Sequence, residues 1–199
     1  DSADLPDAAE LDSALELALD NRDAALREML LNTKREPDMA EVLRVTEAEH
    51  VSGKLDGPWE VWLDHTSQVR STVPFARWLP TRRFPRVQNR TATSYKVRPI
   101  DDATASGLNL AAATQERMRM AGIASLLDAV AFIAEEFHEW GDDGVPLIAK
   151  GDHAQAYRQW PVHPDDIPLL VCLVWDDTVG PEGGFRAFAH KALPFGAFG

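Results

Sequence analysis

Leucine recurs with helical spacing at the start of the chain. Within residues 7–31, five leucines lie four or seven positions apart, and aspartate and glutamate dominate the opposite face. This period predicts one amphipathic helix over residues 7–31. Apolar spacing also predicts a second helix from Pro37 to His50 and a third from Pro58 to Val69, whose tryptophans are expected to pack in the core.

Shorter signals follow in the middle of the chain. Residues 70–95 contain three prolines among arginines and aromatic residues, which predicts an extended basic connection leading into a strand. Residues 112–140 are predicted to be helical, with Ser125 as a cap ahead of Leu126. The apolar run Val145–Ala149 predicts a short buried strand.

The last part of the chain has the pattern of a β-hairpin. Pro168–Trp175 and Phe185–Lys191 are predicted strands, and the connection between them is rich in glycine and aspartate. Together with the helices before them, these strands predict an α+β protein. We expect a helical N-terminal region and a small, mostly antiparallel sheet.

Charge is distributed unevenly in this acidic chain. The net charge is −12, yet residues 65–100 carry 8 basic residues and no acidic one, while residues 1–64 carry 17 acids and 6 bases. A cationic segment of this kind favours an anionic partner such as nucleic acid. The alternative is that the basic segment forms ion pairs with the acidic N-terminal region.

The composition narrows the cellular setting. The one cysteine, Cys172, lies in an apolar run and is expected to be a buried strand residue, so an internal disulfide is excluded. No apolar run reaches the roughly 20 residues that span a bilayer, and the acidic start lacks the positive region of a signal peptide. We therefore expect an intracellular protein, cytoplasmic or nuclear and not secreted, without a membrane partner.

Candidate chemistry lies in two segments. Lys96 and Arg98 alternate on an extended stretch and so share one face, where two cations can grip a polyphosphate. Asp152 follows the predicted strand Val145–Ala149, and a carboxylate at a strand end suits a metal site. Arginines also alternate with aromatic residues before Lys96, a composition that suits nucleic-acid backbones and base stacking.

These segments resemble motifs of reverse transcriptases, especially those of LTR-type retroelements. The pattern D-x-x-x-A-Y from Asp152, followed by P-V, resembles motif A. The run K-x-R-P-I-D-D from Lys96 resembles the fingers motif, and L-P-F-G from Leu193 resembles motif B. The three occur in the family's order, and the resemblance covers residues 80–199.

The resemblance implies a role for each matching position. Asp152 would be the first catalytic aspartate, with the backbone carbonyl of His153 as a further metal ligand. The ring of Tyr157 would lie under the sugar and exclude a 2′-hydroxyl. The residues implied to bind the nucleotide are Lys96, Arg98, Ala156, Tyr157, Phe195 and Gly196. The basic segment adds four candidate contacts to nucleic acid: Arg82, Arg83, Arg86 and Arg90.

The implied reaction is nucleotidyl transfer at a two-metal Mg²⁺ site, for which this chain supplies one recognised carboxylate. The family's other acids come from motif C, an aromatic-x-D-D turn that follows L-P-F-G and is not found here. Asp176 and Asp177 precede L-P-F-G, so they are expected to be turn residues, as are Asp101 and Asp102. We therefore expect the chain to be inactive by itself.

The expected architecture is a partial right-hand polymerase, comprising the fingers and the first part of the palm. Residues 1–79 would be a helical accessory region, 80–145 fingers-like and 146–199 partly palm-like. The implied partners are an RNA/DNA primer–template and deoxynucleoside triphosphates, and the oligomeric state is left open. Two alternatives remain: a catalytically dead relic acting as a binding or scaffold domain, and an unrelated acidic α/β protein that matches three short motifs.

Overall fold

A computed structural model of the protein describes residues 8–33, 36–88, 95–110, 123–139 and 156–194. The chain divides into two compact units. One contains residues 1–113 and 155–199, and the other contains residues 114–154. Helix α4 (Ile123–Glu139) is the described element of the second unit, and all other described elements belong to the first.

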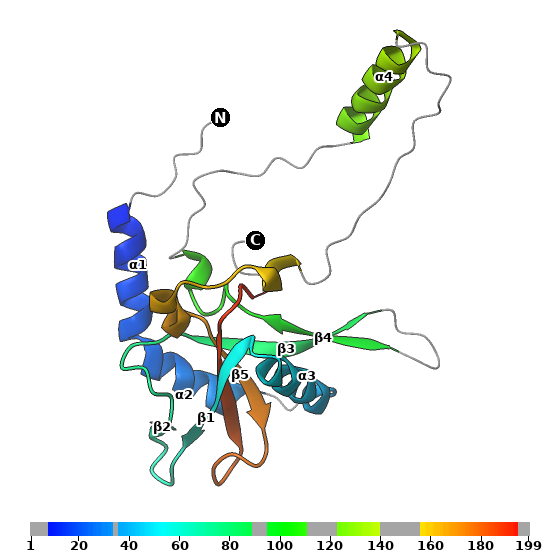
Figure 1. Cartoon of the computed structure of the whole chain (residues 1–199). Helices are drawn as coiled ribbons and strands as arrows, with labels where there is room; N and C mark the ends of the chain where they lie inside the picture. Colours follow the sequence, from blue (N-terminus) through cyan, green and yellow to red (C-terminus); the bar gives the residue numbers. More distant parts are fainter. Residues whose placement is uncertain (1–7, 34–35, 89–94, 111–122, 140–155, 195–199) are drawn as a thin grey trace. The chain divides into compact units, whose positions relative to one another are not determined.

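The first unit is built on a mixed six-stranded sheet (Figure 1). The strand order is β2-β1-β6-β5-β3-β4. Strands β3 and β5 are parallel, and all other neighbours are antiparallel. The strands are β1 (Leu55–Leu63), β2 (Val69–Ser71), β3 (Pro80–Gln88), β4 (Lys96–Asp101), β5 (Val171–Asp176) and β6 (Gly184–His190). The predicted α+β class is confirmed.

Helices cover both faces of this sheet. On one face Leu26 of α2 packs with Leu173, and on the other Val42 of α3 packs with Val174. Strand β5 is therefore buried on both sides, which explains its continuous apolar run. The helices of this unit are α1 (Ala8–Asp20), α2 (Arg22–Asn32) and α3 (Met39–Val51), with the 3₁₀ turns η1 (Leu108–Leu110), η2 (Ala156–Gln159) and η3 (Pro164–Leu169).

The single helix predicted at the start of the chain is wrong, because the chain forms two helices there. Asn21 separates α1 from α2. Leu19 of α1 packs with a cluster around Leu79, whereas Leu26 of α2 packs with the sheet core around Val61. A straight helix does not reach both clusters, so tertiary packing overrides the continuous leucine period.

The helix predicted from Pro58 to Val69 is also wrong. The segment forms most of β1 and the first residue of β2. Val61 is fully buried, and Trp59 and Leu63 pack against the same core cluster. These three residues occupy alternate positions and therefore line one face of a strand. Antiparallel pairing with β6 along β1 stabilises this arrangement.

Most other predicted elements lie where the sequence indicated. The second helix corresponds to α3, and β5 and β6 form the predicted antiparallel hairpin. The basic connection at residues 70–95 contains strand β3, and Lys96–Asp101 is a strand. Helix α4 begins at Ile123, so Ser125 lies inside the helix and is not its cap. The predicted strand Val145–Ala149 falls outside the described residues.

Residues 1–79 do not form a region of their own. Strand β1 lies between β2 and β6 in the same sheet as the later strands. The first compact unit continues past residue 79, and the second unit covers residues 114–154. The expected boundaries at residues 79 and 145 therefore do not coincide with the limits of the compact units.

Candidate functional site

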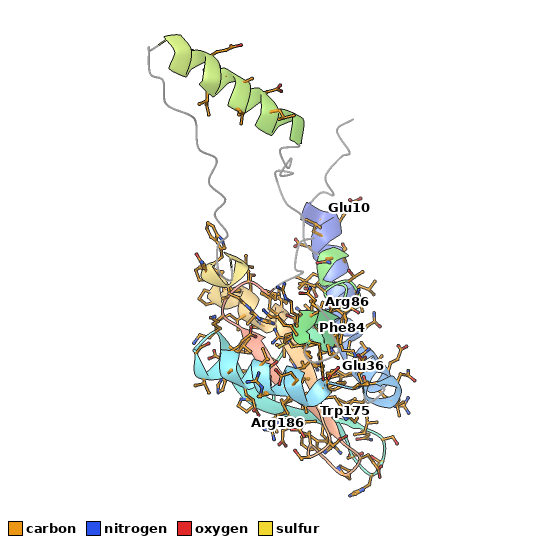
Figure 2. All side chains as sticks on the ribbon, turned by 90° about the vertical axis from the view of Figure 1, so that its right-hand side faces the viewer. Glu10, Glu36, Phe84, Arg86, Trp175 and Arg186 are labelled. Carbon is orange, nitrogen blue, oxygen red and sulfur yellow. The ribbon has the colours of Figure 1, made fainter. Side chains whose placement is uncertain are left out.

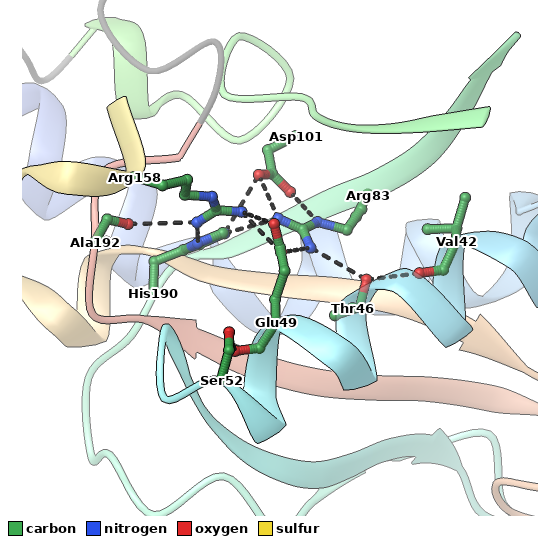
Figure 3. Close-up of polar contacts among 9 residues, drawn as sticks. All are labelled: Val42, Thr46, Glu49, Ser52, Arg83, Asp101, Arg158, His190 and Ala192. Carbon is green, nitrogen blue, oxygen red and sulfur yellow. Dashed lines mark hydrogen bonds and ion pairs between the residues drawn. The ribbon is translucent and has the colours of Figure 1, made fainter. Parts of the chain in front are cut away.

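Arg83 and Asp101 form a buried ion pair between the sheet and helix α3 (Figure 3). They lie directly opposite each other on β3 and β4. The guanidinium donates from Nε to Oδ1 at 2.7 Å and from Nη2 to Oδ2 at 2.9 Å. Their side chains are only 1% and 3% exposed. Two predictions are therefore corrected: Arg83 is shielded from nucleic acid, and Asp101 is not a turn residue.

Glu49 of α3 links this pair to a second arginine. Its carboxylate accepts hydrogen bonds from Arg83 Nη1 at 2.8 Å and from Arg158 Nη2 at 2.9 and 3.1 Å. Arg158 belongs to the turn η2, and its side chain is largely buried. Thr46, one helical turn before Glu49, accepts from Arg83 Nη1 at 3.1 Å and donates to the carbonyl of Val42.

His190, at the end of β6, has a defined tautomer. Its Nδ1 lies 2.6 Å from Arg158 Nη1, and arginine can only donate, so Nδ1 accepts this hydrogen bond. The imidazole proton is therefore on Nε2, which lies 3.3 Å from Asp101 Oδ2. Arg83 Nη2 is 3.4 Å from the same Nε2, but two donors do not bond. The ring thus bridges Arg158 and Asp101.

The cluster is electrically balanced when His190 is neutral, because two arginines face two carboxylates. Burial by itself would raise the pKa of Asp101, but the Arg83 guanidinium and then His190 hold it well below its usual range. Burial lowers the pKa of His190, and Asp101 offsets this only in part. At neutral pH the cluster is therefore an uncharged group of strongly paired ions.

Asp101, Cys172 and His190 offer ligand atoms that lie within 4.8 Å of one another, a spacing that suits a metal ion. Their chemistry does not. Both oxygens of Asp101 already accept hydrogen bonds from Arg83, and burial raises the pKa of the Cys172 thiol to about 12, whereas a thiol ligand must be deprotonated. A divalent cation would also unbalance a neutral buried cluster. These residues do not fit Mg²⁺, which prefers oxygen ligands.

A second candidate feature is the exposed face of the β3–β4 hairpin. Arg86 lies directly opposite Arg98, and Gln88 lies opposite Lys96, so these side chains share one face. Figure 2 labels Phe84 and Arg86 on β3. Arg86, Lys96 and Arg98 are all exposed, and none of them takes part in an ion pair within the described part of the chain. We call these three residues the hairpin cations.

Other arginines of the basic segment pair with the acidic N-terminal region, as the alternative interpretation expects. The pairs are Arg70 with Asp64, Arg77 with Glu16, and Arg82 with Glu36. Arg82, a predicted nucleic-acid contact, is half-buried in its pair. The charge left without an acidic partner in the described part of residues 65–100 is therefore concentrated in the hairpin cations.

The ends of two motif-like segments lie side by side. Val162 N–H donates to the carbonyl of Lys191 at 2.9 Å, and Leu193 N–H donates to the carbonyl of Trp160 at 3.0 Å. An isolated antiparallel bridge lies between these two bonds. The residues that follow A-Y therefore lie next to the start of L-P-F-G.

Several predicted site residues fall outside the described part of the chain. They are Arg90, Asp152, His153, Phe195 and Gly196. Ala156 and Tyr157 lie in the turn η2, where the structure describes the backbone but not these two side chains. The metal ligands and the ring beneath the sugar therefore remain predictions.

The sequence prediction missed Glu49, Arg158 and His190. A signal existed for two of them. Glu49 lies seven residues after Val42, on the buried face of α3, and His190 occupies an interior position two residues after the buried Phe188. An ionisable residue at a position that the apolar period assigns to the core indicates a buried partner. Arg158 has no comparable signal.

No family model, curated protein or solved structure matches this chain significantly. Among the helices that the structure describes, none has the length and apolar character needed to cross a membrane. Evidence for function therefore comes from the residues of this chain alone.

Proposed function

We propose that this chain is the fingers and first palm portion of an RNA-directed DNA polymerase. In this proposal the hairpin cations contact phosphates of the primer–template and of the incoming deoxynucleotide. The three motif-like segments of the sequence are its basis. Two observations support it: the exposed cationic face of the β3–β4 hairpin, and the hydrogen bonds that join the residues after A-Y to the start of L-P-F-G.

The observation that carries most weight is the direct opposition of Arg86 and Arg98 on adjacent strands. Like charges that face each other across a ladder destabilise a sheet. Acidic residues are plentiful in this chain and pair with Arg70, Arg77 and Arg82 nearby. A phosphate between Arg86 and Arg98 would relieve the repulsion and accept hydrogen bonds from both guanidinium groups. This arrangement favours an anionic ligand.

In the intact protein the proposed reaction is nucleotidyl transfer, with Asp152 as a catalytic carboxylate. The hairpin cations would orient the phosphates and offset their negative charge. A catalytically dead relic would keep the cationic hairpin without the reaction. Asp152→Asn in the intact protein separates these cases: polymerisation lost on substitution supports the enzyme, and an intact protein without polymerase activity supports the relic.

Duplex binding tests the proposal directly in this chain. We expect the chain to bind a fluorescent RNA–DNA primer–template with an affinity that falls as salt rises. The double variant R86Q/R98Q should reduce the slope of log K against log salt by about 0.9 for each phosphate that the chain no longer neutralises. The matched control is R70Q/R77Q, which removes the same charge from the same basic segment at positions already paired with acids.

The outcomes divide clearly. A salt-dependent affinity that R86Q/R98Q lowers and R70Q/R77Q preserves supports the proposed surface. An affinity that does not weaken with added salt contradicts phosphate contacts. Equal losses in both double variants would mean that net charge alone attracts the duplex, and the hairpin would not be the binding surface.

A further inference from the structure

Arg158 connects three parts of the first unit through one guanidinium group. It donates to Glu49 of α3, to His190 Nδ1 at the end of β6, and to the carbonyl of Ala192 at 3.4 Å. It also belongs to the same 3₁₀ turn as Ala156 and Tyr157. The side chain therefore fixes a motif-A-like turn to a helix and to the chain that leads into L-P-F-G (Figure 3).

Glu49 extends this connection to the strand that carries the hairpin cations. Its carboxylate contacts Arg158 and also Arg83, whose guanidinium holds Asp101 at the end of β4. Lys96 and Arg98 precede Asp101 on that strand. The three sequence segments that resemble one nucleotide site are therefore linked through a carboxylate that comes from outside the resemblance.

The geometry exceeds what stability alone requires. Replacing a buried ion network with apolar residues of similar size is often neutral or stabilising, so a charged network is not needed to hold these elements together. Its specific property is direction. A planar guanidinium with several defined acceptors fixes both the distance and the orientation of the groups it joins. Here those groups are η2, α3 and the end of β6.

We propose that Glu49 and Arg158 are a pair of positioning residues, which set the turn η2 against β4 and β6 and thereby determine nucleotide affinity. The nucleotide part of this inference rests on the proposed function. Neither residue needs to touch the ligand. Helix α3, which matches no motif, is then a component of the site because it supplies the shared carboxylate.

Two conservative variants test the pair without removing a buried charge. Glu49→Asp keeps the carboxylate but shortens its reach by one methylene, and Arg158→Lys keeps the cation but lacks the planar fork. Glu47→Asp, at an exposed position of the same helix, is the matched control. For each variant we would measure binding of a fluorescent dATP analogue with Mg²⁺, binding of the RNA–DNA duplex, and the amide NMR signals of residues 158–162.

We expect E49D and R158K to weaken nucleotide binding roughly tenfold while duplex affinity stays near that of the unsubstituted chain. The amide signals of residues 158–162 should shift in both variants and not in E47D. A merely structural role would weaken nucleotide and duplex binding together. Equal losses of both affinities, or nucleotide affinity unchanged in both variants, would overturn the positioning role.

The proposed function fails in a different way. If the unsubstituted chain binds neither nucleotide nor duplex, the polymerase proposal is contradicted, and the amide signals alone decide on the pair. Signals of residues 158–162 that shift in E49D and R158K but not in E47D would still support positioning of the turn. Signals that do not shift in those two variants would overturn it.

Discussion

Arg83 places a complete guanidinium in the interior, and the cost of its desolvation is offset by Asp101 and Glu49. Burial alone would lower the pKa of Arg83, but the adjacent Asp101 carboxylate raises it well above its usual range, so the charge persists. The pair therefore depends on both members. Removing one leaves a buried charge without its partner.

Asp101→Asn should destabilise the chain by about 3 to 5 kcal/mol, because the buried Arg83 would no longer face a bidentate carboxylate. The control is Asp102→Asn at the next position, where Oδ1 accepts a hydrogen bond from the Ala105 N–H and an amide oxygen can do the same. That variant should stay within about 0.5 kcal/mol. Urea unfolding measures both. Equal effects at the two positions would contradict the assigned role of Asp101.

His190 should make stability depend on pH between neutral and mildly acidic conditions. Burial depresses its pKa below the ordinary value of 6.5. As pH falls through 6.5, the unfolded chain takes up a proton that the folded chain refuses, so the free energy of unfolding decreases, by at most about 1.4 kcal/mol per pH unit. The decrease from this group ends below the folded pKa.

Urea unfolding at several pH values between 7.5 and 5 would measure this dependence. His190→Gln should remove it, even though the substitution lowers stability at every pH. His65→Gln, at an exposed position, should leave it unchanged. The groups facing His190 are Asp101, Arg83 and Arg158. An unchanged pH slope in His190→Gln would mean that the titration belongs to another group.

At the scale of elements, the β3–β4 hairpin combines two opposite faces. Arg83 and Asp101 lie on the face toward α3, and the hairpin cations lie on the exposed face. The alternation of a strand is responsible, because neighbouring residues point to opposite sides. A buried ion pair and an exposed anion-binding surface can therefore share one short ribbon.

Arg98→Glu should separate folding from binding on this hairpin. It places a carboxylate directly opposite Arg86 and replaces repulsion with attraction, so stability should rise by about 0.2 to 1 kcal/mol. Duplex binding should weaken, because the substitution removes a cation that attracts phosphates and adds a carboxylate that repels them. Urea unfolding and duplex titration measure the two effects. Stability that falls together with affinity would contradict this account of the exposed face.

The sequence predicted some elements because their signals are local. The alternation of Lys96 and Arg98 identified an exposed strand face, and the apolar runs identified the β5–β6 hairpin. Strand β1 was missed because Trp59 and Trp62 also have helical spacing, and its stability comes from pairing with the distant β6. The burial of Arg83 could not be read from its neighbours, since it depends on which residues the fold places opposite.

At the scale of the whole molecule, the N-terminal segment is part of the sheet rather than an addition to it. Strand β1 pairs with β6, Leu26 and Leu30 pack in the sheet core, and Glu49 completes the buried cluster. The acidic N-terminal region also neutralises several arginines of the basic segment. These contacts explain how a strongly acidic segment and a strongly basic one coexist in one compact unit.

Removal of residues 1–64 should therefore abolish cooperative folding. The remaining chain would lack β1, α2 and α3, and would expose apolar side chains on both faces of β5. Urea titration followed by circular dichroism should show a gradual change in place of a sharp transition. A shortened chain that still unfolds cooperatively would mean that the later strands form a core of their own.

The adjacency of β1 and β6 also has a consequence for biosynthesis. On the ribosome, β1 emerges long before β6 has been translated, so its apolar face has no permanent partner during most of elongation. The nascent chain can form helices and the short β1–β2 ladder, but the central layer closes only after residue 190 has left the exit tunnel. Val61 and its neighbours are therefore a natural target for chaperones, and slow translation of the second half would prolong their exposure.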